Sequence, residues 1–336
     1  MRAIQLSAFG LDHLDPVDLP TPRPGPHDVL VRMEAASLNF RDHMLVNGDL
    51  YRGVPLPIVP VSDGAGTVQE VGGAVTRFKP GDRVTTFYKS RWIAGAMRPE
   101  WEGAEIGGPH PGVMREFACF DQYSLARAPA HLTSVQSATL PIAALTAWQA
   151  LELARITAGQ TVLLLGTGGV SLFALQFAKL RGAHAIVLSS SDAKLERAKV
   201  LGADVGINYA KHPQWGALVR EASRGAGVEL VVETIGAATL AQSLEAVRMH
   251  GMIAVLGWIG GSEAALPLTP VVLKRVRVQG ISVASLEAHE QMVAAIDATG
   301  LEPVVDHVYG FGQLREAFEQ LVAGRHFGKL AVDFSA

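Results

Sequence analysis

The chain has 336 residues, of which 49% are hydrophobic and 18% are charged, and its formal net charge is −3. That length predicts two domains, and the charge gives no reason to expect nucleic acid or an anionic membrane as a partner. The single cysteine, Cys119, excludes an intramolecular disulfide, and the lack of a signal-peptide or membrane-spanning pattern leads us to expect a cytoplasmic protein.

The first part of the chain, residues 1–123, consists of short strand-like runs separated by proline and glycine. Runs of this kind lie at 29–33, 66–71 and 82–87, and turn signals stand between them. This pattern predicts a mainly antiparallel, barrel-like domain. Residues 89–113, rich in glycine, proline and tryptophan, are interpreted as a long surface loop with a binding role.

Strands and helices alternate from residue 124 to residue 288, which predicts an α/β domain with a doubly wound parallel sheet. The expected strands are 161–165, 184–188, 205–209, 230–234, 252–256 and 276–282. The expected helices are 172–180, 193–201, 215–222 and 239–247. Residues 289–336 break the alternation, and we expect them to complete the first domain.

A glycine-rich loop follows the first apolar strand of this second domain and opens a helix. It consists of Gly166, Thr167, Gly168, Gly169, Val170 and Ser171. The first glycine permits a tight turn, the second lets the backbone approach a pyrophosphate, and the helix N-terminus attracts that anion. The small Ser171 replaces the third glycine of the usual pattern. We interpret the loop as a dinucleotide site; the alternative is a purely structural turn.

The end of the next strand indicates which dinucleotide is bound, because an NAD site carries an acid there. This chain has Ser189, Ser190 and Ser191 instead, followed by Asp192 and Lys194. Small hydroxyl groups leave room for a 2′-phosphate, and a lysine can donate to it. The sequence therefore favours NADP(H). The alternative is that Ser191 or Asp192 caps the following helix and Lys194 is solvated, and both interpretations can hold together.

Taken with their order along the chain, several short motifs resemble the medium-chain dehydrogenase/reductase superfamily, in its zinc-independent quinone oxidoreductase and enoyl reductase branch. They lie at 38–42, 63–68, 79–84, 145–148, 166–171, 201–204 and 328–329. The resemblance implies a GroES-like catalytic domain of residues 1–123 completed by 289–336, and a Rossmann NADP-binding domain of residues 124–288. It also implies an active-site cleft between the domains and a homodimer formed along the sheet edge near 276–282.

The resemblance also concerns zinc, which the alcohol dehydrogenase branch binds through a cysteine and a His-Glu pair. At the matching positions this chain has Asn39, Ser62 and Asp63. A catalytic zinc site needs three nitrogen, sulfur or carboxylate ligands from the protein, and only Asp63 of these three could serve. We therefore expect no metal.

Other cofactor contacts follow from the resemblance, position by position. It places Asn39 beside the nicotinamide and Thr146 beside its ribose. It places Lys194 and Tyr209 at the 2′-phosphate, and strand ends with Gly257, Trp258 and Ser282 at the carboxamide. Lys329 falls where the C-terminal segment closes over the cofactor. The alternatives are a strand-end packing role for Tyr209 and an aggregation-deterring edge lysine at 329.

These features predict hydride transfer from NADPH to a quinone or an α,β-unsaturated carbonyl compound. The candidate catalytic residues are Asn39, His43 and Asp63. Met44 stands where many relatives have a proton-donating tyrosine, so Tyr51, Tyr88 and solvent are further candidate donors. We expect Arg41 and Asp42 to form a local ion pair, and Trp92, Met97 and Trp101 to line the acceptor pocket or a dimer contact.

Two other functions stay open. One is an alcohol or aldehyde dehydrogenase of the same superfamily, which would require a metal. The other is a non-catalytic NADPH-binding protein.

Overall fold

A computed structural model describes all 336 residues, and they form two compact units. Unit 1 comprises Met1–Leu145 and Ala284–Ala336, and unit 2 comprises Thr146–Val283. The division after residue 145 lies later than the expected one after residue 123. The reason is that α2 (Ser134–Ser137) packs on β3 and β4 of the first sheet, so the chain leaves unit 1 only after this helix.

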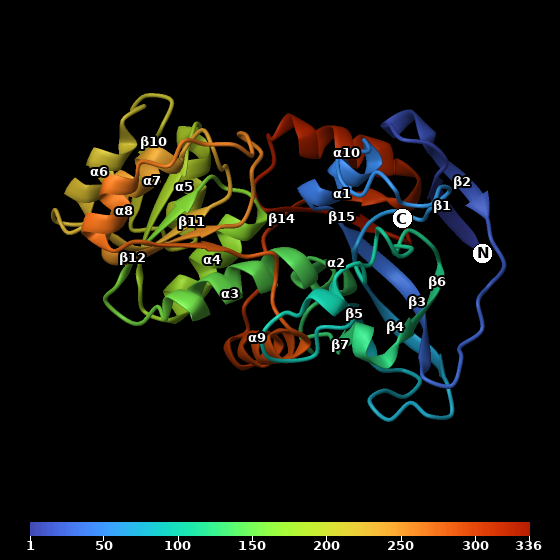
Figure 1. The fold of residues 1–336 in the computed structure, drawn as a ribbon. Coiled ribbons are helices and arrows are strands. Elements are labelled where there is room, and N and C mark those ends of the chain that lie inside the picture. Colours follow the sequence, from blue (N-terminus) through green and yellow to red (C-terminus); the bar gives the residue numbers. More distant parts are fainter. The chain divides into compact units, whose positions relative to one another are not determined.

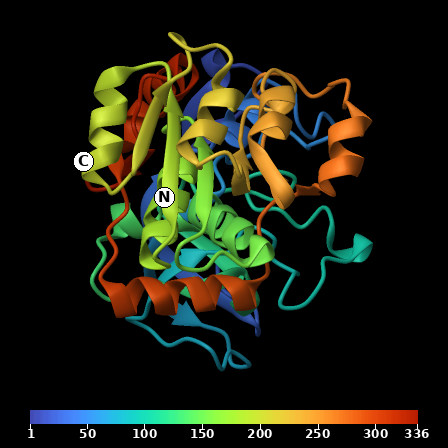
Figure 2. The same cartoon turned by 90° about the vertical axis from the view of Figure 1, so that its left-hand side faces the viewer.

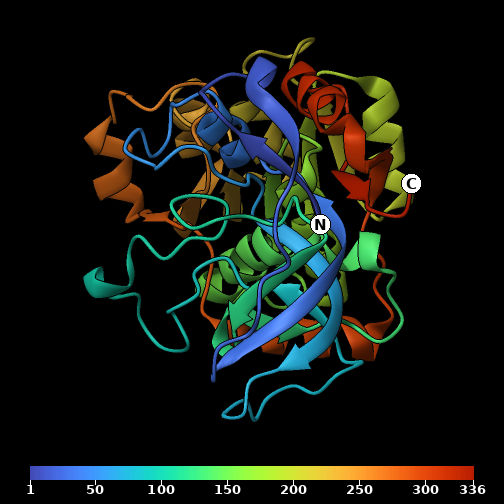
Figure 3. The same ribbon diagram turned by 90° about the vertical axis from the view of Figure 1, so that its right-hand side faces the viewer.

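Unit 1 is built on a mostly antiparallel seven-stranded sheet of order β14-β15-β3-β4-β5-β7, with β6 also pairing with β3. The strands are β3 (Asp28–Ser37), β4 (Asp63–Val71), β5 (Arg83–Thr86), β6 (Phe117–Asp121), β7 (Leu125–Arg127), β14 (Val305–Gly310) and β15 (Lys329–Asp333). A separate hairpin joins β1 (Arg2–Leu6) and β2 (Leu14–Asp18). The predicted antiparallel domain is confirmed, and β3, the long blue strand of Figure 3, lies at its centre.

Unit 1 has few helices. Besides α2, they are α1 (Phe40–Val46), α9 (Leu286–Thr299) and α10 (Leu314–Ala323). Apolar side chains of the sheet and of α10, among them Val31, Val68 and Phe318, are buried in one core. The C-terminal segment belongs to this unit, because β15 pairs antiparallel with β3, with Ala331 opposite Ser37 (Figure 1). That pairing brings the start of β15, Lys329, close to the end of β3.

Unit 2 is a six-stranded sheet of order β10-β9-β8-β11-β12-β13 in which all pairings are parallel. The strands are β8 (Thr161–Leu165), β9 (His184–Ser189), β10 (Val205–Asn208), β11 (Val228–Glu233), β12 (Val247–Val255) and β13 (Arg277–Gly280). This order is that of the Rossmann sheet, with the direction of winding reversed between β8 and β11. The predicted doubly wound parallel sheet is therefore confirmed.

Helices flank this sheet on both sides (Figure 2). They are α3 (Leu145–Ala154), α4 (Gly169–Leu180), α5 (Asp192–Val200), α6 (Trp215–Ala222), α7 (Leu240–Ala246) and α8 (Leu268–Lys274). The central strand β8 is almost fully buried, as expected when helices cover both faces of a parallel sheet. No helix in the structure is long and apolar enough to cross a membrane.

The segment 89–113 loops out of unit 1 with a single 3₁₀ turn at Pro99–Trp101 (Figure 3). The expectation of a surface loop is only partly right, because Ala104, Glu105 and Ile106 are buried. Lys89 Nζ lies 2.5 Å from Glu105 Oε1, and both side chains are buried. This ion pair joins the two arms of the loop, a contact that the composition of the segment did not indicate.

Candidate active site and dinucleotide-binding loop

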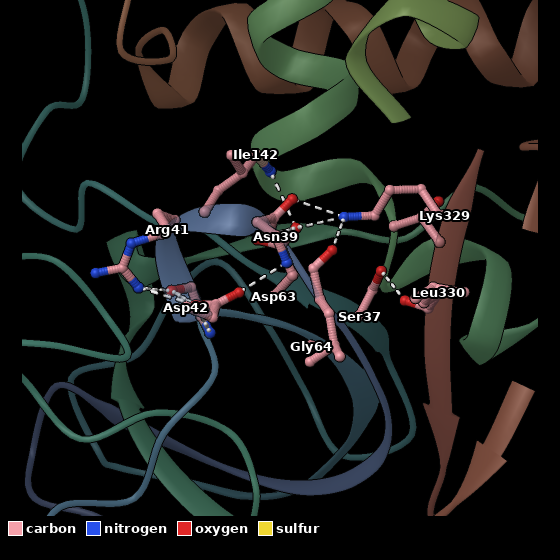
Figure 4. Close-up of polar contacts among 12 residues, drawn as sticks. Ser37, Asn39, Arg41, Asp42, Asp63, Gly64, Ile142, Lys329 and Leu330 are labelled. Carbon is pink, nitrogen blue, oxygen red and sulfur yellow. Dashed lines mark hydrogen bonds and ion pairs between the residues drawn. The ribbon is translucent and has the colours of Figure 1, made fainter. Parts of the chain in front are cut away.

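Three polar side chains converge where β3 ends and α1 begins (Figure 4). The ammonium group of Lys329 donates to Asn39 Oδ1 and to the Leu38 carbonyl, each at 2.6 Å. Asn39 Nδ2 donates to Asp63 Oδ2 at 2.8 Å, and the backbone N–H of Ile142 reaches the same oxygen at 3.4 Å. Lys329 Nζ itself lies 3.9 Å from Asp63 Oδ2. Asn39 is thus fixed between a cation and a carboxylate.

The cation and the carboxylate of this cluster are both buried. Asp63 is 0% exposed and Lys329 is 3% exposed. Burial raises the pKa of Asp63 to about 7, although Lys329 and the Asn39 hydrogen bond act in the opposite direction. Burial likewise lowers the pKa of Lys329, against the attraction of Asp63. The second Asp63 oxygen, Oδ1, is buried without a hydrogen-bond partner. The buried surroundings of Asp63 and Lys329 therefore favour the neutral form of each group, and their mutual attraction favours the charged forms.

Asn39 is the member of the cluster that has partly exposed surface. Its amide oxygen accepts from Lys329, and one of its two N–H bonds is directed at Asp63. Since an amide nitrogen has two donors, one N–H of Asn39 remains for another partner. The cluster therefore presents a single oriented donor whose amide oxygen is polarised by a cation.

A second buried network lies beside it on α1. Asp42 is fully buried, and its Oδ1 accepts from Arg41 Nη1 at 2.9 Å and from Ser62 Oγ at 2.8 Å. Asp42 Oδ2 accepts from the Asn39 backbone N–H at 2.9 Å, which fixes the start of the helix. Arg41 also donates to the carbonyls of Gly107 and Gly108. The expected Arg41–Asp42 ion pair is present, and it ties the 89–113 segment to the helix.

Of the proposed proton donors, His43 lies apart from Asn39, Asp63 and Lys329, and it forms no hydrogen bond with them. Its Nε2 faces Asn47 Nδ2 at 3.0 Å, and its Nδ1 is buried without a partner. Burial lowers the pKa of His43, so the ring is neutral near pH 7. Tyr51 and Tyr88 instead pack their rings on the guanidinium of Arg41, and burial raises the pKa of Tyr88 well above its usual value.

The glycine-rich loop of unit 2 has the geometry that the sequence predicts. Gly166 has φ +80° and follows β8, and Gly168 precedes the first turn of α4. A side chain built at either glycine would meet no atom within 4 Å, so the space in front of the loop is open. The hydroxyl of Ser171 donates to the Leu165 carbonyl at 2.8 Å and joins helix to strand. The residues fit a dinucleotide pyrophosphate, which would meet the free N–H groups of the helix N-terminus.

The serines after β9 have local roles in the structure. Ser191 accepts from the Lys194 backbone N–H at 3.4 Å, so the capping alternative is present. Ser189 is buried, whereas Ser190 is exposed. Tyr209 donates its backbone N–H to the Ser189 carbonyl at 3.1 Å, and its side chain is 43% exposed. That exposure argues against the alternative of a ring packed on the sheet, and leaves it available to a ligand.

The other proposed cofactor positions in unit 2 occupy the elements expected of them. Thr146 is buried in α3, Gly257 and the half-exposed Trp258 follow β12, and Ser282 follows β13. Their contacts with a nicotinamide stay predictions. Lys329 belongs to unit 1, and its burial excludes the alternative of an exposed strand-edge lysine.

Nowhere in the structure do three histidine, cysteine, aspartate or glutamate side chains come together as a metal site would require. At the position of the zinc ligands, Ser62 is bonded to Asp42, and Asp63 faces Asn39 and an ammonium group. A cation within 4 Å of the only carboxylate would repel a metal ion. The residues present therefore do not fit a catalytic zinc.

Comparison with known proteins places these features in a family. Residues 25–130 match the alcohol dehydrogenase GroES-like domain, and residues 169–298 match the zinc-binding dehydrogenase domain. A zinc-type alcohol dehydrogenase-like protein of Schizosaccharomyces pombe is 39% identical over 331 residues, which cover 96% of each chain.

Solved structures resemble this chain over its whole length. The structure of an NAD-dependent alcohol dehydrogenase is 33% identical, with a TM-score of 0.91 and 99% of both chains covered. The quinone oxidoreductase of Coxiella burnetii is 26% identical, with a TM-score of 0.80 and the same coverage. The chain therefore belongs to the medium-chain dehydrogenase/reductase superfamily, whose members bind a nicotinamide cofactor, and it is an oxidoreductase.

Proposed function

We propose that the protein is an NADPH-dependent, zinc-independent reductase of quinones or α,β-unsaturated carbonyl compounds. The observation that supports this most is the Asn39 amide, fixed by Lys329 and Asp63 with one N–H left over. Hydride addition to such an acceptor creates an enolate or quinol oxygen, and an oriented donor stabilises that developing negative charge. A simple ketone needs more stabilisation than one neutral donor supplies, because the charge of the alkoxide stays on a single oxygen.

Each residue of the cluster has its own role in this reaction. NADPH supplies the hydride when bound. Asn39 donates a hydrogen bond to the acceptor oxygen, while Lys329 and Asp63, which are buried behind it, fix the orientation of its amide. Asp63 thus acts as a positioning residue, despite its place among the proposed catalytic residues. The proton that completes the reduction comes from solvent, because the neutral His43 forms no hydrogen bond with the cluster and is a poor acid.

The preference for NADPH over NADH is supported by the residues after β9. No acid stands at Ser189 to bind both ribose hydroxyls, while Ser190 and the Tyr209 ring have exposed surface. The nearest acid, Asp192, accepts from Asn208 at 2.6 Å and from Lys211 at 2.5 Å. Because Lys211 balances the negative charge of that carboxylate, Lys194 and its neighbours offer a site for a 2′-phosphate.

An alcohol dehydrogenase of the zinc type is the second candidate, because the Schizosaccharomyces pombe relative bears that name. The donor set around Asp63 weighs against it. The specific difference is Lys329, whose amino group lies 3.9 Å from Asp63 Oδ2 and donates to Asn39, where a zinc ion would need free ligands.

A direct assay separates these functions. Oxidation of NADPH and of NADH is followed with quinones, enones, enoyl thioesters and aldehydes, with a metal chelator present. We expect turnover of quinones or enones with NADPH faster than with NADH, unchanged by the chelator. Loss of activity in chelator, restored by zinc, would support the alcohol dehydrogenase. NADPH binding without turnover of any acceptor would support a non-catalytic role.

We also infer a homodimer joined along the β13 edge of unit 2. Helix α8 has no buried residue, and Leu268, Val272 and Leu273 are 67–68% exposed. Val278 is exposed on β13, which forms the free edge of the sheet. Apolar side chains gathered beside an open strand edge are typical of an interface. We expect light scattering to give twice the chain mass, and Val278→Lys to give the monomer; a monomeric parent protein would contradict the inference.

A further inference from the structure

A pocket of about 750 Å³ in unit 1 lies between β6 and the 89–113 segment. The two sites have no residue in common. Its lining combines cationic and aromatic side chains, among which Arg91, Trp101, His110, Arg115, Phe120 and Tyr123 matter here. Nothing in the proposed reaction uses this pocket.

Arg115 is the unusual member of the lining. Its guanidinium has no hydrogen bond and no ion pair in the structure, and its Nε is buried without a partner. Burial lowers the pKa of Arg115, but a guanidinium stays charged at any physiological pH. Arg115 is half-buried beside the pocket, and no carboxylate of the protein pairs with its charge, so its guanidinium is open to an anion in the pocket.

Cations buried elsewhere in unit 1 have the carboxylate partner that Arg115 lacks. Arg41 is paired with Asp42, Lys89 with Glu105, and Lys329 lies beside Asp63. The carboxylate in the Arg115 pocket is Asp121, which is exposed and accepts from the Tyr123 backbone N–H at 2.8 Å. It forms no ion pair with Arg115. Arg91 adds a second positive charge to the lining, so the pocket has an excess of positive charge.

The other residues that line the pocket indicate the chemistry of the uncharged part of the ligand. Trp101, Phe120 and Tyr123 give flat apolar surfaces next to the cations, and Ile93 and Ile106 add aliphatic ones. A guanidinium presents paired N–H donors that match a carboxylate or a phosphate. We propose that this pocket binds a small organic oxyanion, a carboxylate or a phosphate attached to an aromatic or apolar group, with Arg115 as its anchor.

The experiment measures binding to the full-length protein by calorimetry, with NADP⁺ saturating so that the dinucleotide loop is filled. The probes are benzoate and phenyl phosphate, with the neutral benzamide as control. We expect one of the two anions to bind and benzamide not to bind, and the anion that binds more tightly identifies the head group. Absence of binding by both anions would overturn the proposal.

Matched variants locate the site. Arg115→Met should weaken binding of the anion by at least about tenfold, the usual loss for a hydrogen-bonded charge, and should unfold at the same or a higher temperature than the parent. Arg115→Lys should bind with an intermediate affinity. Lys79→Met, which removes an exposed positive charge from the same unit, should bind like the parent. Equal binding by Arg115→Met, or a changed oligomeric mass in that variant, would overturn the assignment.

Discussion

Replacing Lys329 by methionine is expected to lower the free energy of unfolding by about 3–5 kcal/mol, the usual cost of breaking a buried ion pair by removing one partner. The methionine fills a similar volume but leaves Asp63 without its cation, and leaves the Leu38 carbonyl and Asn39 Oδ1 without a donor. Urea denaturation with the parent protein alongside measures the change.

The size of this loss should depend on pH. Lys329 lowers the pKa of Asp63, so its removal raises that pKa above the present value of about 7. In the variant, Asp63 is neutral at pH 6 and is forced toward ionisation at pH 9, where a lone buried carboxylate is costly. The destabilisation should therefore be larger at pH 9 than at pH 6. A loss that is the same at both pH values would contradict the pairing.

The double variant Lys329→Met with Asp63→Asn provides the internal control. It removes both charges, and replacing a buried pair as a whole is often close to neutral for stability. We expect the double variant to lose much less stability than the sum of the two single variants. Additive losses would show that the two groups do not interact.

Replacement of Asn39 should lower the rate of reduction much more than the affinity for NADPH. Asn39→Ala removes the oriented N–H, and loss of one such donor lowers kcat by about 100-fold or more. NADPH affinity should change much less, because the donor acts on the acceptor. In the Lys329→Met and Asp63→Asn double variant the amide persists without its anchors, so kcat should fall to a smaller extent. A normal kcat in Asn39→Ala would remove this residue from the mechanism.

The alternation of strands and helices was sufficient to predict the parallel sheet of unit 2 and the glycine loop. Each of those elements is defined by local periodicity and by residues a few positions apart. The Asn39 cluster is different, because Lys329 follows Asn39 by almost the whole chain and meets it only through the pairing of β15 with β3. Sequence position suggested that Lys329 had a role but not that it was buried.

The surroundings of Arg115 also could not be predicted from the sequence. An arginine just before a strand is usually solvated, and nothing adjacent in the sequence indicates that Arg115 would line a pocket without an ion-pair partner. The buried contacts of the 89–113 segment were missed for a related reason. Its glycine and proline content indicates a loop, but composition does not report that Lys89 and Glu105 pair at its base.

Acid should destabilise unit 1 through a residue that none of the proposed sites uses. His289 on α9 is completely buried beside the Phe87 ring, and neither of its ring nitrogens has a hydrogen-bond partner. Burial lowers the pKa of His289 to about 4, from an ordinary value near 6.5. Below pH 6.5 the unfolded chain takes up a proton at His289 that the folded chain does not take up. The free energy of unfolding therefore falls as the pH falls from 7 toward 4. Between pH 7 and pH 5 the loss from this group is about 2 kcal/mol.

Two neutral replacements test this account. In His289→Leu and His289→Gln nothing titrates at position 289, so each variant should lose about 2 kcal/mol less stability than the parent between pH 7 and pH 5. Their stabilities at pH 7 will differ from one another, because leucine restores apolar packing and glutamine leaves buried polar atoms. Their shared change in pH dependence is the diagnostic result. If the parent and both variants lose stability in parallel, the imidazole gains a proton in the folded protein and the acid sensitivity has another source.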